Sequence, residues 1–250
     1  MGSFIFNVLW EELRSGSTPE MQSEDYDRLC DENSLKYGGN DYKSHAMATA
    51  VAGYAVSEDY EQDKAVFTEI YNLLQPLCDK EVIGCFDFDS RAKDSYYVDF
   101  SMEFDIDEGC RVFFEGTAEG IVQQVRSYLN EHRELFVARE AAVVLVDGLG
   151  EELRTLPESG PYKTVFRQFD FSRLYGSGWS FYLWIKWNPF GNSHLLELVA
   201  DRKGYPYKSS CLLMSGSKED LERMLILKDY DLKEQITYKI PSLYTGLNNY

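Results

Sequence analysis

The chain of 250 residues is 44% hydrophobic and 15% aromatic, which is enough apolar surface to build a packed core. Its 42 acidic residues against 25 basic ones give a formal net charge of −17 at pH 7. Because phosphate groups and anionic lipids are bound through Lys and Arg, this balance argues against direct nucleic acid binding and against membrane binding.

The cysteines and the N-terminus indicate the compartment. The five cysteines are an odd number and are too widely spaced for a disulfide framework or a zinc site. The apolar stretch 4–9 is short, has no preceding basic residue and leads into acidic residues, unlike a signal peptide. No apolar run approaches the ~18 residues that a membrane span needs. We therefore expect a cytoplasmic protein with reduced thiols and no cofactor.

Residues 1–81 are predicted to form an acidic helical region. The clearest helix follows Ser57, a residue type that caps helix N-termini. Its first turn carries acidic residues, whose negative charge the helix dipole stabilises at this end. Pro76 lacks a backbone donor and clashes with the preceding turn, so we expect the helix to end or kink near Gln75.

From Val82 onward the apolar residues alternate with polar ones, which is typical of strands. The pattern predicts a first βββα module over residues 82–135. Its strands are expected at 82–89, 96–104 and 110–114, and its helix at 117–132.

The connecting segment 136–178 is predicted to hold two further strands, at 142–146 and 164–171. After it, the alternation returns and predicts a second βββα module within residues 179–250, which also include the C-terminal tail. Its strands are expected at 181–188, 194–201 and 210–214, followed by a helix from Ser217.

The starts of the two module helices are alike. Residues 116–119 read Gly-Thr-Ala-Glu and residues 216–219 read Gly-Ser-Lys-Glu, 100 residues further on. An internal duplication explains this match, whereas the alternative is two unrelated meanders that each end in a helix. We therefore predict an α+β fold, with the N-terminal helical region followed by two tandem βββα modules, mainly antiparallel sheet, packed as one compact unit.

Asp87 and Asp89 are candidate catalytic residues because they follow an apolar strand segment. Two carboxylates two residues apart at a strand end can share a divalent cation. The alternation also has a simpler reading, in which Phe86 and Phe88 point into the core and the two acids face water.

The sequence offers little else for catalysis. His45, His132 and His194 stand alone, without the spacing of zinc ligands, and no motif marks an activated serine or cysteine. The lack of catalytic motifs favours a binding function over an enzymatic one.

The segment 179–187 carries aromatic residues on both faces of a predicted strand. We expect the odd-numbered residues to belong to the core. Tyr182 and Trp184 lie on the other face. They are either covered by a second layer or exposed as part of a recognition patch, since Tyr and Trp are preferred interface anchors.

Two acidic clusters are candidate partner-binding surfaces. Such clusters are either solvated faces or electrostatic recognition surfaces. The first contains Glu24, Asp25, Asp27 and Asp31, and the second contains Asp105, Asp107 and Glu108.

These observations lead to one preferred function and two alternatives. The preferred one is a non-enzymatic inhibitor or neutralising partner, of the immunity, antitoxin or anti-defence type, that acts on a basic surface of a target protein. The first alternative is a metal-dependent hydrolase or nucleotidyl transferase that uses Asp87 and Asp89. The second is a scaffold or adaptor subunit.

Overall fold

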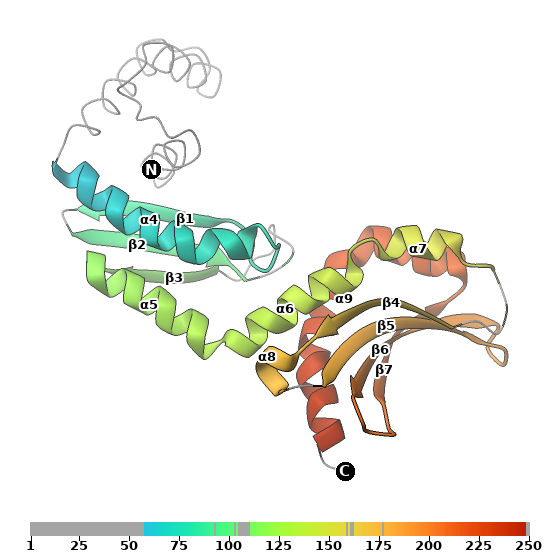
Figure 1. The fold of residues 1–250 in the computed structure, drawn as a ribbon. Helices are drawn as coiled ribbons and strands as arrows, with labels where there is room; N and C mark the ends of the chain where they lie inside the picture. The colour runs from blue at the N-terminus through green and yellow to red at the C-terminus, as the bar shows by residue number, and fades with distance from the viewer. Residues whose placement is uncertain are drawn as a thin grey trace, which may run out of the picture. The chain divides into compact units, whose positions relative to one another are not determined.

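The structure is a computed structural model that describes residues 58–92, 94–102, 104, 111–158, 160, 163–176 and 178–248. Helices and antiparallel sheets make up the described chain (Figure 1), so the predicted α+β class is confirmed. The chain divides into two compact units. Among the described helices, none combines the length and apolar character needed to cross a bilayer.

The described part of the first unit contains two helices and a three-stranded antiparallel sheet with the order β1-β2-β3. The three strands and the following helix confirm the predicted first module. The elements are α4 (Glu58–Cys78), β1 (Phe86–Ala92), β2 (Ser95–Ser101), β3 (Arg111–Gly116) and α5 (Ala118–Glu131).

The helix α4 runs past the position near which we expected it to end or kink. Pro76 lies inside its last turn, and the helix ends at Cys78. A proline in the last turn removes one backbone donor, and here it does not end the helix at Gln75. The helices expected in the first 57 residues lie outside the described residues.

The helices α4 and α5 pack on the same face of the first sheet. The ring of Phe67 in α4 lies 5.3 Å from the ring of Phe88 in β1. The ring of Tyr128 in α5 lies 6.0 Å from Phe100 in β2 and 5.5 Å from Phe114 in β3. Because side chains alternate along a strand, the residues between these aromatic ones point to the opposite face.

The second unit contains α6 (Arg133–Val146) where a strand was predicted at 142–146, so that prediction is wrong. The buried residues Ala138, Ala141, Ala142 and Leu145 recur at the three- and four-residue spacing of a helix face. The β-branched residues in this stretch favour a strand only weakly, and packing of the apolar face outweighs that preference.

The second sheet has four antiparallel strands in the order β4-β5-β6-β7. Its strands confirm the three predicted for the second module and the one predicted at 164–171, which forms the edge strand β4. The remaining elements are α7 (Leu149–Thr155), β4 (Lys163–Asp170), α8 (Ser172–Tyr175), β5 (Trp179–Asn188), β6 (Ser193–Arg202), β7 (Ser209–Gly216) and α9 (Lys218–Asn248).

The core of the second unit lies between one face of this sheet and the helices α6, α7 and α9. On β5 the odd-numbered Phe181, Leu183 and Ile185 are fully buried, as expected. The helix α9 begins with a capping box, in which Ser217 Oγ donates to Asp220 at 2.7 Å and accepts from the Asp220 backbone N–H at 3.1 Å.

The two meanders run in the same order, and each ends in a helix with a hydroxyl at its start. In the first, the Gly120 N–H donates to Thr117 Oγ1 at 3.3 Å, and in the second, Ser217 has the matching place. The internal duplication itself stays a prediction.

Candidate functional site on the first sheet

The face of the first sheet opposite α4 and α5 carries a row of three side chains, one from each strand. In the strand register Asp87 is opposite Asp99, and Asp99 is opposite Phe113. Directly opposed side chains on one sheet face are close neighbours. Two carboxylates and an aromatic ring therefore lie side by side across β1, β2 and β3.

A second row, formed by Asp89, Tyr97 and Glu115, runs parallel to the first on the same face. Two residues further along each strand, it again combines two acids with one aromatic side chain. We call the two rows together the acidic face. Glu115 is exposed, and Asp89 and Tyr97 are half-buried.

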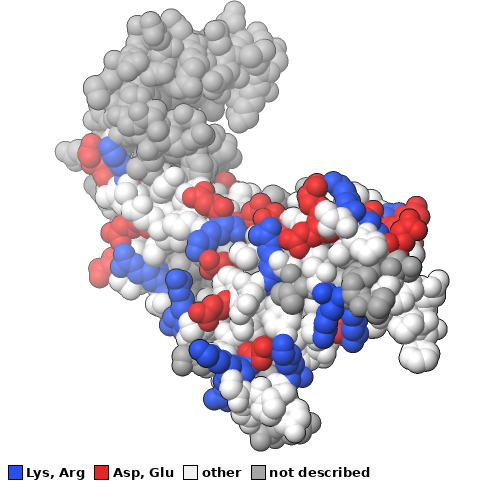
Figure 2. Space-filling view, turned by 45° about the vertical axis from the view of Figure 1, so that its right-hand side comes forward, with Lys and Arg blue, Asp and Glu red and all other residues white. Residues whose placement is uncertain are grey.

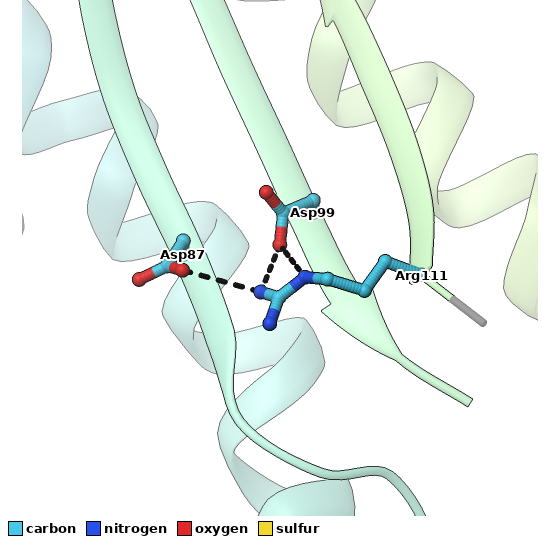
Figure 3. Close-up of polar contacts among 3 residues, drawn as sticks. All are labelled: Asp87, Asp99 and Arg111. Carbon is cyan, nitrogen blue, oxygen red and sulfur yellow. Dashed lines mark hydrogen bonds and ion pairs between the residues drawn. The ribbon is translucent and has the colours of Figure 1, made fainter. Parts of the chain in front are cut away.

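Arg111 supplies a positive charge to this face. Its Nη2 donates to Asp87 Oδ2 at 3.2 Å, and its Nε donates to Asp99 Oδ1 at 2.6 Å. Figure 3 shows the two carboxylates, from β1 and β2, converging on the guanidinium that β3 supplies. Partial burial works against the charged form, but the hydrogen bond and the negative charge of Asp99 raise the pKa of Arg111 above its ordinary value.

Exposure differs sharply along the first row. The Asp99 side chain is 13% exposed and is held by Arg111, whereas the Asp87 side chain is 51% exposed. Phe113 is 69% exposed although it is a large apolar residue. An exposed aromatic ring beside carboxylates can anchor a partner whose surface offers apolar stems and positive charges.

The candidate catalytic residues Asp87 and Asp89 both lie on the acidic face, and Arg111 contacts the first of them. Arg111 occupies the space between Asp87 and Asp99 in which a cation would bridge them. Asp89 lies two positions along the strand, about 7 Å from Asp87 at its Cα atom. Within the described ranges, no three His, Cys, Asp or Glu side chains are grouped as metal ligands.

Charge of both signs is found on the surface of the described chain. Figure 2 shows acidic and basic side chains interspersed on the face in view, with neutral surface between them. The predicted clusters of Glu24, Asp25, Asp27 and Asp31, and of Asp105, Asp107 and Glu108, lie outside the described residues.

Tyr182 and Trp184 belong to the second unit, where lysines lie against their rings. Tyr182 is 6% exposed, and its hydroxyl accepts from Lys208 Nζ at 2.6 Å. Lys163 Nζ lies 3.4 Å from the centroid of the half-buried Trp184 ring. The indole N–H of Trp184 donates to Glu197. A role of these two residues in partner binding stays a prediction.

Sequence reasoning missed Phe113, Tyr97 and Arg111. The adjacent Phe113 and Phe114 both look like core residues in a sequence, because alternation alone does not say which of two apolar neighbours points inward. The signal lay in the phase of β3, where Arg111, Phe113 and Glu115 share one face.

No family model and no curated protein matches this chain. A solved structure described as that of the plant transcriptional regulator PBF-2 matches over 66% of this chain and 80% of that one, with 11% identity and a TM-score of 0.21. A TM-score this low does not establish a common fold, and no property of that regulator is assigned to this chain.

Proposed function

We propose that this chain is a non-enzymatic binding protein that docks on a basic surface of another protein and thereby inhibits or neutralises it. The observation that carries the proposal is the row of Asp87, Asp99 and Phe113 on the acidic face. It combines an exposed aromatic anchor with carboxylates that select for positive charge.

Electrostatic attraction would raise the rate of association with the partner and favour basic partners over acidic ones. A net charge of −17 attracts a basic partner over long range and repels acidic ones. Phe113 would supply the contact from which water is excluded. Buried aromatic anchors contribute most of the binding energy at protein interfaces, whereas charges at the rim contribute little.

Arg111 positions the two carboxylates of the first row. By holding Asp99 in place and reaching Asp87, it fixes the acids beside the ring of Phe113. A preformed arrangement loses less side-chain entropy on binding than one that must be assembled.

Parallel affinity purifications from the protein's own cell extract test the proposal. One bait is the wild-type chain, a second carries Asp87→Lys and Asp89→Lys, and a control carries Glu131→Lys and Asp147→Lys, an equal charge change at exposed helix ends. We expect a basic protein on the wild-type and control baits and its loss from the second bait. Equal recovery on all three baits would contradict the proposal.

A further inference from the structure

The helix α9 carries an exposed apolar patch that the proposed binding site does not use. Met224, Ile226, Leu227 and Tyr230 are 39%, 72%, 73% and 47% exposed, and we call these four residues the α9 patch. Leu225, within the same stretch, is only 6% exposed. The helix therefore has one apolar face toward the core and a second one toward solvent.

The members of the α9 patch are neighbours on the helix surface. Met224 and Leu227, like Leu227 and Tyr230, are three residues apart, and Ile226 and Tyr230 are four apart. Apolar side chains scattered singly over a surface need no explanation, but a contiguous patch marks an interaction surface.

The residues on the two sides of Leu227 match one another when two copies of this stretch lie antiparallel. Met224 and Tyr230 lie three residues before and after Leu227, and Arg223 and Asp231 lie four residues before and after it. In a symmetric pair, residue i contacts residue j of the other copy and j contacts i. Two antiparallel α9 helices that cross at Leu227 would therefore bring Arg223 of each copy to Asp231 of the other.

We propose that a second copy of this chain covers the α9 patch, so that the protein forms a symmetric dimer through antiparallel α9 helices. Leu227 packs on its own copy, and Met224 packs on Tyr230. The matched charges at Arg223 and Asp231 fix the antiparallel direction, as charged pairs flanking an apolar seam do in coiled coils.

Within one copy, Arg223 Nη2 lies 3.1 Å from Asp220, and both side chains are largely exposed. An exposed ion pair of this kind contributes little to stability, so releasing Arg223 from Asp220 costs little. The dimer does not depend on the acidic face. Because two chains of −17 repel each other, the dimer is best measured at physiological salt or above, where this repulsion is screened.

Sedimentation equilibrium of the full chain over a wide concentration range tests this proposal. We expect a reversible monomer–dimer equilibrium, which Leu227→Ser abolishes. Arg223→Asp and Asp231→Arg should each weaken the dimer by about tenfold or more, because each places like charges opposite one another. The double variant Arg223→Asp/Asp231→Arg should restore the dimer.

The two single variants change the net charge in opposite directions, so a shared loss of dimer cannot come from net charge. Phe190→Ser serves as control, since Phe190 is fully exposed and lies in the turn between β5 and β6, outside the α9 patch. Far-UV circular dichroism and the melting temperature verify that each variant is folded. A wild-type chain that stays monomeric, a dimer indifferent to Leu227→Ser, or a double variant as weak as the singles overturns the proposal.

Discussion

Asp99 lies directly opposite Phe113 in the register of β2 and β3, on the sheet face turned away from α4 and α5. The first side chain is 13% exposed and the second residue 69% exposed. A buried carboxylate beside an exposed aromatic ring inverts the usual distribution, in which charge faces water and aromatic rings are buried. This inversion is the physical reason for assigning a binding role to the acidic face.

Phe113 and its neighbour Phe114 should separate binding from stability. Phe114→Ala removes ring contacts with Phe100 and Tyr128 and should cost about 2 to 4 kcal/mol of unfolding free energy. Phe113→Ala should change stability by less than about 0.5 kcal/mol, yet weaken partner binding at least about tenfold. Urea denaturation and titration calorimetry with the captured partner measure the two effects. A destabilised Phe113→Ala variant would mean that the ring belongs to the core.

Leu225 and Leu227 offer a second matched pair, two residues apart on α9. Leu225→Ala should cost about 2 to 5 kcal/mol, because the side chain is 6% exposed and its removal leaves a cavity. Leu227→Ala should cost less than about 0.5 kcal/mol in the monomer, since that residue is 73% exposed. Urea denaturation at low protein concentration measures both. Similar losses in the two variants would show that the assigned phase of the helix is wrong.

His194 should make stability depend on pH. It is 1% exposed, and burial lowers the pKa of its imidazole, with the charge of Lys218 acting in the same direction and a backbone hydrogen bond at Pro157 acting against it. The unfolded chain therefore takes up a proton at a higher pH than the folded one. Stability from this group is present above about pH 6.5 and is lost as the pH falls below that value, by up to about 1.4 kcal/mol per unit.

Comparison of the wild type with His194→Gln isolates this contribution. Urea denaturation from about pH 8 to about pH 5 should show a shallower fall in unfolding free energy for the variant. Carboxylates that titrate in the same range contribute to both proteins and cancel in the difference. An identical slope in the two proteins would mean that His194 does not titrate differently on folding.

Asp87 and Asp89 should not form a divalent cation site. Calorimetric titration with Mg²⁺ or Mn²⁺ should give the same result for the wild type and for Asp89→Asn, because Arg111 already lies against Asp87, where a cation shared by the two acids would bind. Asp89→Asn should also leave folding close to that of the wild type. Saturable binding in the wild type that is lost in this variant would instead favour the metal-dependent enzyme.

Local patterns predicted most of the secondary structure. Alternation located all seven strands of the two sheets to within a few residues, and the Ser217 signal located the start of α9. The misassigned segment at 142–146 shows the limit of the method. A short apolar run rich in valine is compatible with a strand or a buried helix, and only its contacts with α9 decide between them.

The candidate site was less predictable because it depends on register between strands. Asp87 was identified as a candidate from its position at a strand end, but its row includes Phe113, which is 26 residues away in the sequence. Pairing at such distances has no local signature. The same holds for Arg139, which is 2% exposed and lies 3.1 Å from Glu234, 95 residues further along the chain.

Site-specific photocrosslinking tests the central claim, that a basic protein docks on the acidic face, most directly. A photoreactive phenylalanine analogue is placed at Phe113 in one protein and at Phe190, the more exposed residue of the second unit, in another. Both are irradiated in the protein's own cell extract, and the adducts are identified by mass spectrometry. We predict a covalent adduct with one basic protein at position 113 that is lacking at position 190 and that fades as salt is raised. The same adducts at both positions, or no adduct at position 113, would contradict the account.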